Sequence, residues 1–206
     1  MDFVDMQLSK RAADFAKIIT NSVCSTLIQT RIDLETAMQQ VMEHLRQLRA
    51  KKQTLYIVGN GGSAAVASHA LVDFVNVAKI NAQVLHESSL ITCMANDFKY
   101  ENAYSRVLLQ CMKAEDMLIA ISSSGQSLNI CNAARAAKEC GARIITFTGF
   151  KSDNPLRFLG DYNFWLDSND YGYVEVGHQF LLHNLSDRFG VENNMELAKY
   201  SEMITV

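Results

Sequence analysis

Apolar residues recur at three- and four-residue steps through the first quarter of the chain, which is the spacing of one face of an α-helix. A first stripe comprises Leu8, Ala12, Phe15, Ile19 and Val23, and a second comprises Leu34, Met38, Val41, Leu45 and Leu48. Neither Gly nor Pro interrupts residues 5–49. The pattern predicts two long amphipathic helices, each with an apolar face that needs a partner.

Beyond residue 50, short apolar runs alternate with helical stretches. The runs predict strands at residues 54–58, 82–86, 117–122, 143–148 and 162–167. The stretches between and after them predict helices at 63–79, 101–113, 127–140 and 175–189, with a further short helix at 192–204. This alternation is typical of an α/β fold with a parallel sheet, helices on both faces and right-handed crossovers.

Residues 1–50 are interpreted as an N-terminal helical arm. The arm belongs to the same domain as residues 51–206, which form the α/β unit. The two helices of such an arm can pack on another subunit, and they can also pack on each other or on the domain. Because the arm precedes a compact sheet, we expect packing on another subunit, and therefore an oligomer.

Two of the predicted strands end in similar small polar sequences. Residues 59–63 read GNGGS, residues 122–127 read SSSGQS, and each segment then enters a predicted helix. Glycines let the backbone approach an anion, while free amides and hydroxyls donate hydrogen bonds to it. Ligands of such sheets bind beyond the carboxyl ends of the strands. The loops predict a site for a small phosphorylated metabolite, and the missing Walker lysine and GxGxxG spacing disfavour nucleotides.

Composition narrows the class of protein. The 206 residues, 49% of them hydrophobic and 20% charged, suit one domain with a sizeable core. A net charge of -3 disfavours a nucleic-acid groove, and no apolar run is long enough for a membrane span. The five cysteines are scattered without CxxC pairs, which indicates free thiols. With no signal-peptide pattern at the N-terminus, we expect a cytoplasmic protein.

Two pairs of side chains have spacings that suit a metal ion. His69 and Asp73 are four residues apart, and Glu175 and His183 are eight apart, so each pair shares one face of a predicted helix. Two imidazoles and two carboxylates can bind zinc, although each histidine taken alone is better explained by local hydrogen bonds, and only the four together favour a metal. His178 lies off that face and is predicted to be structural.

The segments "VGNGGSAA", "SHALVD", "ANDF", "AISSSGQS" and "ITFTG", in this order, resemble the sugar isomerase (SIS) domain family. Within that family they are most similar to the phosphoheptose isomerases. The resemblance implies a flavodoxin-like three-layer α/β/α fold with a five-stranded parallel sheet. It also implies a homotetramer with active sites at subunit interfaces, in which the N-terminal arm takes part. The implied activity interconverts sedoheptulose 7-phosphate and D-glycero-D-manno-heptose 7-phosphate.

The resemblance also implies roles for individual residues. Substrate and its phosphate would be bound by Asn60, Gly61, Gly62, Ser63, Ser122, Ser123, Ser124, Ser127 and Glu175. Zinc would be held by His69, Asp73, Glu175 and His183. The catalytic residues would be Asp73, His183 and Asp97. In this scheme Asp73 and His183 exchange protons during an enediol isomerisation that the metal assists.

The sequence departs from the family pattern at four places. Asp73 replaces a glutamate and Glu175 a glutamine, while Val77 stands in place of an arginine and Gly172 in place of an aspartate. These departures leave two alternatives open. One is a non-catalytic phosphosugar-binding protein that acts as a sensor or assembly factor. The other is an isomerase of a different sugar phosphate.

Overall fold

A seven-stranded sheet lies at the centre of the protein. The computed structural model describes residues 6–204, and side chains for residues 6–195. The strands are β1 (Val23–Thr26), β2 (Arg31–Ile32), β3 (Thr54–Val58), β4 (Asn81–Val84), β5 (Met117–Ser122), β6 (Arg143–Thr148) and β7 (Tyr162–Trp165). They are arranged in the order β2-β1-β7-β6-β5-β3-β4.

Five neighbouring strands, β7-β6-β5-β3-β4, are parallel and correspond to the five predicted ones. Numbered among themselves along the chain, they have the order 2-1-3-4-5 of flavodoxin-like sheets. The order reverses between β3 and β5, so the crevice at that switch point lies between the ends of these two strands. These are the strands that the GNGGS and SSSGQS segments follow.

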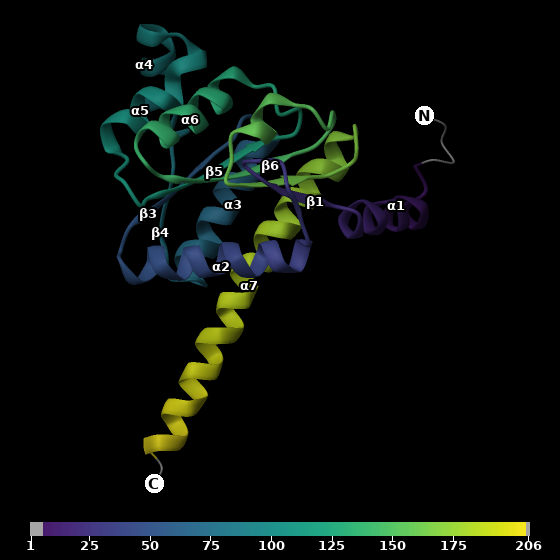
Figure 1. The fold of residues 1–206 in the computed structure, drawn as a ribbon, viewed down its shortest axis with the longest axis vertical. Helices are drawn as coiled ribbons and strands as arrows, with labels where there is room; N and C mark the ends of the chain where they lie inside the picture. The colour runs from purple at the N-terminus through teal and green to yellow at the C-terminus, as the bar shows by residue number, and fades with distance from the viewer. Residues whose placement is uncertain (1–5, 205–206) are drawn as a thin grey trace.

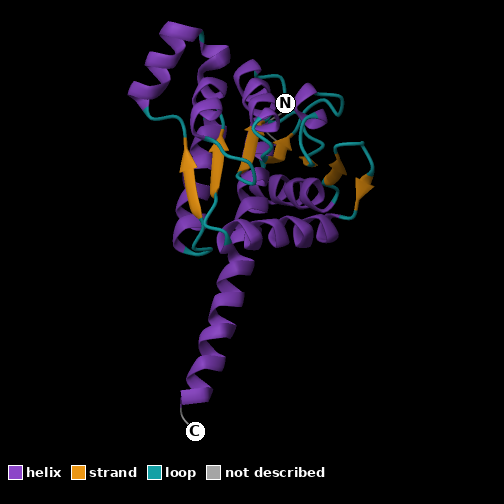
Figure 2. Ribbon diagram, turned by 60° about the vertical axis from the view of Figure 1, so that its left-hand side comes forward, coloured by secondary structure: helices purple, strands orange, loops and turns teal. Residues whose placement is uncertain are grey.

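Helices cover both faces of the sheet (Figure 1). They are α1 (Leu8–Thr20), α2 (Leu34–Ala50), α3 (Gly62–Asn76), α4 (Ser88–Phe98), α5 (Ala103–Cys111), α6 (Leu128–Glu139) and α7 (Tyr171–Ile204), with 3-10 turns at Tyr100–Asn102 and Pro155–Phe158. Apolar side chains of α2, α3 and α7 join one core with Leu55 and Ile57 of β3. Those of α5 and α6 join the opposite core with Tyr56 and Val58. The alternation along β3 therefore produces the three layers, which Figure 2 shows from the side.

The prediction of a five-stranded sheet is wrong by two strands. An antiparallel hairpin of β1 and β2 pairs with the edge strand β7 and enlarges the sheet to seven. Val23, which the helical stripe included, pairs with Trp165 in this hairpin. The apolar spacing was compatible with a helix, but Thr20, Ser22, Ser25 and Thr26 are poor helix formers that favour an interruption.

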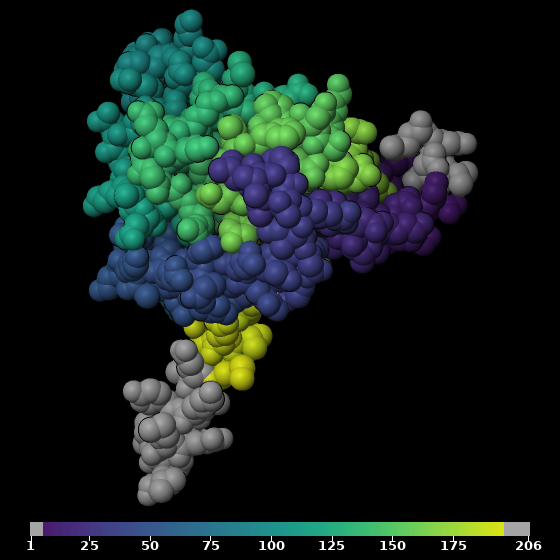
Figure 3. Space-filling view, in the orientation of Figure 1, coloured from purple at the N-terminus to yellow at the C-terminus, as the bar shows by residue number. Residues whose placement is uncertain are grey.

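The two N-terminal helices have different environments. In α2, Ala37, Val41 and Leu45 are fully buried against the sheet, so this helix belongs to the core. Asp33 accepts a hydrogen bond from the Thr36 amide at 2.9 Å and caps its start. In contrast, α1 has no buried residue and lies at the margin of the molecule (Figure 3). Only α1 resembles the predicted arm.

The C-terminal helical residues belong to one element. The predicted helices at 175–189 and 192–204 are a single helix, α7, whose far end extends away from the sheet (Figure 1). A helix at Ser88–Phe98, α4, was not predicted from the sequence. None of the helices in the described part of the chain combines the length and apolar character needed to cross a bilayer.

His178 connects α7 to the sheet, as the prediction of a structural role requires. Its side chain is fully buried, and Nε2 donates a hydrogen bond to the Thr148 carbonyl oxygen at 3.1 Å. Nδ1 has no partner among the described residues, so the neutral imidazole is the form that fits this environment. Burial lowers the pKa of His178 from 6.5 to about 4, and the Thr148 hydrogen bond opposes this only in part.

We predict that acid destabilises the protein through His178. Because the folded-state pKa is below the unfolded one, the unfolded chain binds more protons between pH 6.5 and about 4. This contribution to stability is complete above pH 6.5 and is lost as the pH falls through that window, by up to roughly 3 kcal/mol. Urea unfolding of the native protein and of His178→Gln should show a flatter pH dependence in the variant. Identical slopes would contradict the prediction.

Candidate functional site

A hollow of about 220 Å³ lies between the loops that follow β3 and β5. All nine residues predicted to bind substrate or phosphate line it: Asn60, Gly61, Gly62, Ser63, Ser122, Ser123, Ser124, Ser127 and Glu175. Two further lining residues, Ile121 and Tyr171, were not predicted. Ile121 precedes the end of β5, whereas Tyr171 opens α7 four residues before the predicted helix start. Asp170 accepts a hydrogen bond from the Tyr173 amide at 3.2 Å and so caps the helix. An aspartate at this position is the sequence signal that indicates the earlier start.

The loop after β3 depends on two glycines. Gly61 precedes α3 with φ 53° and ψ -123°, a conformation that side chains disfavour. A Cβ on Gly59 would lie 2.5 Å from the Ser63 carbonyl oxygen, so only glycine lets the strand end approach the helix so closely. The result is that the amino terminus of α3, with its unpaired amides, borders the hollow.

The loop after β5 is built in a related way. Gly125 has φ 64°, and a Cβ there would lie 1.9 Å from Oδ1 of Asn154. The Ser122 hydroxyl contacts that of Ser127 at 3.3 Å, so both point to the same region. The Ser123 hydroxyl is buried and has no hydrogen-bond partner among the described residues. Such an orphaned hydroxyl beside a helix start fits an oxyanion ligand.

The charge of the hollow is unusual for an anion site. Glu175 is the only charged side chain in its lining, so the available donors are neutral hydroxyls and amides. Its carboxylate lies against Gly62, where a Cβ would be 2.3 Å from both carboxylate oxygens. A bound phosphate would therefore need the α3 and α6 amino termini, and a cation from outside the lining, to offset Glu175.

Three of the four predicted metal ligands come together on α3 and α7. Oδ2 of Asp73 lies 3.5 Å from Nε2 of His69 and 3.2 Å from Nδ1 of His183. The two imidazole rings are 4.8 Å apart in an edge-to-face arrangement. One ligand atom from each residue lies within 4.8 Å of the others. The i, i+4 spacing on α3 places the first pair together, and helix packing adds His183.

This group fits a metal ion. Oδ2 of Asp73 is buried without a conventional hydrogen bond among the described residues, although it faces two imidazoles. Two histidines and one carboxylate, with a further position open, form a donor set of catalytic zinc sites. His69 retains 56% of its side-chain exposure, so the group is accessible from outside the subunit.

Two predicted site residues lie outside this group. Glu175 is two helical turns from His183, about 12 Å along α7, and lines the hollow instead. Asp97 lies on the exposed last turn of α4, where its carboxylate accepts a hydrogen bond from Asn96 at 2.9 Å and contacts Cys93. Within the described residues of one subunit, Asp97 borders neither the hollow nor the metal group.

Gly172 stands where the family pattern has an aspartate, and the nearby Asp170 does not supply the missing carboxylate to the hollow. The Asp170 carboxylate binds the Arg11 guanidinium of α1 at 2.7 Å, and this hydrogen bond lowers the pKa of Asp170. Asp170 is absent from the lining of the hollow. Arg11 also lies 3.7 Å from the centre of the Tyr173 ring, so the cluster attaches α1 to the start of α7.

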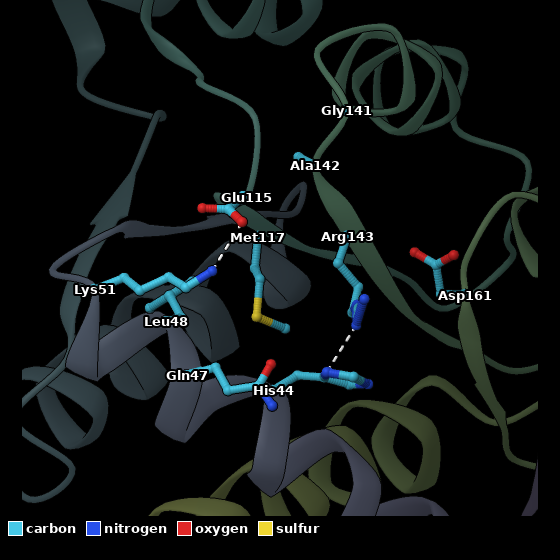
Figure 4. A pocket seen from close by; sticks show the side chains of 10 residues that line it. All are labelled: His44, Gln47, Leu48, Lys51, Glu115, Met117, Gly141, Ala142, Arg143 and Asp161. Carbon is cyan, nitrogen blue, oxygen red and sulfur yellow. Dashed lines mark hydrogen bonds and ion pairs between the residues drawn. The ribbon is translucent and has the colours of Figure 1, made fainter.

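A second hollow, of about 280 Å³, opens at the opposite edge of the sheet (Figure 4). Met117 and Arg143, the first residues of β5 and β6, line it, so it lies at the amino ends of the strands. Lys51 is paired with Glu115 at 2.8 Å, and Arg143 donates to Nδ1 of His44 at 2.7 Å. Its lining has two cations and two carboxylates, Glu115 and Asp161, and it contains none of the serines that line the first hollow.

Comparison with known proteins agrees with this arrangement. The SIS domain family matches residues 20–149. A phosphoheptose isomerase of Mycobacterium tuberculosis is 30% identical over 183 residues, which cover 86% of this chain and 92% of that protein. One from Nitratidesulfovibrio vulgaris is 33% identical and covers 74% and 77%. The solved phosphoheptose isomerase of Neisseria gonorrhoeae superposes with a TM-score of 0.72 at 25% identity, covering 89% and 98%.

This chain therefore belongs to the SIS domain family, as its loop motifs predicted. The three relatives described above, each matched over most of this chain, are phosphoheptose isomerases.

Proposed function

We propose that this protein is a phosphosugar isomerase that interconverts sedoheptulose 7-phosphate and D-glycero-D-manno-heptose 7-phosphate. The chain is an aldose–ketose isomerase by its relatives. The observation that carries the proposal is the presence of two sites on the same pair of helices. The hollow lies at the amino ends of α3 and α7, and the His69, Asp73 and His183 group lies further along both.

The separation of the two sites supports a long substrate. Ser63 and His69 are six residues apart on α3, which corresponds to about 9 Å along the helix axis. A sugar phosphate whose ester is at one end and whose carbonyl is at the other spans this distance when extended. A triose phosphate is too short to occupy both sites, so the spacing favours heptose phosphates and other long-chain sugar phosphates.

The proposed chemistry is a proton transfer between neighbouring carbons. Asp73 takes the proton from the carbon beside the carbonyl, and His183 gives a proton to the carbonyl oxygen, with the roles exchanged in the reverse direction. Their side chains are 3.2 Å apart, so both reach the same two carbons. The serine-lined hollow holds the ester phosphate, and that remote binding energy aligns the carbons with the pair.

A zinc ion held by His69, Asp73 and His183 would supply Lewis acidity at the carbonyl oxygen and stabilise developing negative charge. The two oxygens of the Asp73 carboxylate allow it to serve both as ligand and as base. Glu175 remains a proposed contact of the bound substrate, since it lines the hollow and lies about 12 Å along α7 from His183.

We further propose a cytoplasmic homotetramer with sites at subunit interfaces. Large apolar side chains are exposed on both helices of the metal group, at Val72 (59%) and Val75 (47%) of α3 and at Val176 (57%) and Phe180 (50%) of α7. Cover from a neighbouring subunit would exclude water from the proton transfer and would let Asp97 of an exposed helix reach a site. All five cysteines are unpaired, which suits a reducing compartment.

The alternative of a phosphosugar-binding protein without turnover rests on Val77 and Gly172, which replace two polar residues of the family pattern. It predicts binding of sugar phosphates without proton exchange. An isomerase of another sugar phosphate predicts exchange with a different substrate, so one assay on a panel of ketose phosphates distinguishes the three.

We predict that Asp73→Asn and His183→Gln each lower kcat by at least about 10²-fold, because each removes a proton-transfer group. Turnover of sedoheptulose 7-phosphate and deuterium incorporation from deuterated water, at C1 of this ketose and at C2 of the aldose product, provide the measurement. The control is His44→Gln, a histidine at the opposite edge of the sheet, which should keep native turnover. Wild-type rates in either site variant, with normal circular dichroism, would refute the assignment.

Metal content tests the ligand group separately. Zinc measured by mass spectrometry after dialysis should fall from about one ion per subunit to a small fraction in His69→Ala, because only two ligands remain. The native content should persist in His86→Ala, whose imidazole contacts Ser68 at 2.8 Å outside the group. Equal zinc in all three proteins would place the ion elsewhere.

The subunit arrangement is tested by sedimentation equilibrium. A tetramer mass is expected for the native protein, and dissociation is expected for Val72→Asp because it buries a charge in the proposed interface. Ile28→Asp, at the exposed tip of the hairpin, should remain tetrameric. A monomeric native protein would contradict the proposal.

A further inference from the structure

A pair of asparagine side chains connects the two loops of the hollow. Nδ2 of Asn60 donates to Oδ1 of Asn129 at 2.8 Å, and Nδ2 of Asn129 donates to Oδ1 of Asn60 at 2.8 Å. Asn60 belongs to the loop after β3, whereas Asn129 lies in the first turn of α6, directly after the serine-rich loop. Asn129 is only 3% exposed, so water competes little for these bonds.

Two tyrosines hold the same loop from a second side. The Tyr100 hydroxyl donates to Oδ1 of Asn60 at 2.9 Å, and the Tyr104 hydroxyl donates to the Gly59 carbonyl oxygen at 2.9 Å. Burial raises the pKa of Tyr104 to about 12, so its hydroxyl stays protonated as a donor at neutral pH. The loop after β3 is therefore anchored independently of Asn129.

The hydrogen bonds determine which way the Asn60 amide faces. Its Oδ1 accepts from both Asn129 and Tyr100, which uses both lone pairs. Its Nδ2 gives one hydrogen to Asn129, and the other has no partner in the described part of the chain. A flipped amide would set the two NH2 groups against each other. Because Asn60 lines the hollow, the remaining N–H is available to a ligand there.

We propose that Asn129 is a positioning residue for this site. It holds the Asn60 amide in the one orientation that presents an N–H donor to a hydroxyl or carbonyl oxygen of the sugar, while the serines bind the phosphate. The proposal rests on the proposed function in that the ligand is a sugar phosphate, but it requires only binding and not turnover. Asn129 itself makes no contact with the ligand, and it is not in the lining of the hollow.

Calorimetric affinities of two ligands, sedoheptulose 7-phosphate and inorganic phosphate, test the role. Asn129→Ala frees the Asn60 amide to rotate, so the Kd of the sugar phosphate should rise about five- to tenfold. The Kd of inorganic phosphate, which needs only the serine loops, should change less than twofold. The matched control is Asn132→Ala, one turn further along α6, whose side chain donates to the Glu101 carbonyl at 2.9 Å. Both of its affinities should be native.

A double-mutant cycle separates positioning from a general weakening of the fold. If Asn129 acts only through Asn60, Asn60→Ala and the Asn60→Ala/Asn129→Ala double variant should bind the sugar phosphate equally weakly. Should Asn129→Ala fail to fold, Tyr100→Phe removes another contact to the same Oδ1 from a half-exposed position, and a two- to fourfold rise in the sugar phosphate Kd is expected.

Additive effects in the cycle, or equal losses for both ligands, would overturn the positioning role. Native affinity of Asn129→Ala for the sugar phosphate would also overturn this role. If Asn129→Ala does not fold, native affinity of Tyr100→Phe for the sugar phosphate would overturn it. The proposed function fails differently, through a native protein that binds sedoheptulose 7-phosphate but neither isomerises it nor exchanges its C1 protons.

Discussion

The packing of α3 against α7 is the interaction on which the rest of the site depends. Phe74 on α3 and Leu182, Leu185 and Phe189 on α7 are buried in one core with the sheet. Because each helix begins at the carboxyl edge of the sheet, the same contact aligns their amino ends at the hollow and the residues two to three turns further along at the metal group. A shift of α7 by one turn would keep much of the apolar contact but would separate His183 from Asp73.

The candidate site has two parts, which are the hollow lined mainly by neutral hydrogen-bond donors and the group of His69, Asp73 and His183. The hollow presents hydroxyls, amides and helix termini, and Glu175, where the family pattern has an uncharged glutamine, is the one charged side chain among the described residues of its lining. That substitution weakens anion binding unless a cation lies nearby, and it strengthens cation binding. Metal and phosphosugar are therefore expected to support each other's binding in this chain more than in relatives that keep the glutamine.

Prediction was most reliable where the chemistry is local. The five parallel strands and the two anion loops follow from β-branched runs and from glycines at strand ends, and these act over a few residues, whereas the individual lining residues followed from the family resemblance. It failed at residues 20–32, where an apolar spacing typical of a helix was outweighed by edge pairing to β7. The partner strand lies some 140 residues away in the sequence, so no local pattern could reveal it.

The amino-acid sequence by itself determined the α/β order, the family, and the i, i+4 pairing of His69 with Asp73, because helix geometry alone brings those two together. Tertiary structure decided that His183 completes the group, that Glu175 faces the hollow, and that Asn60 is held by Asn129. Each of these contacts joins elements far apart in the chain, and their geometry depends on how helices pack across the sheet. Periodicity assigns a residue to a helix face, but only packing determines what that face meets.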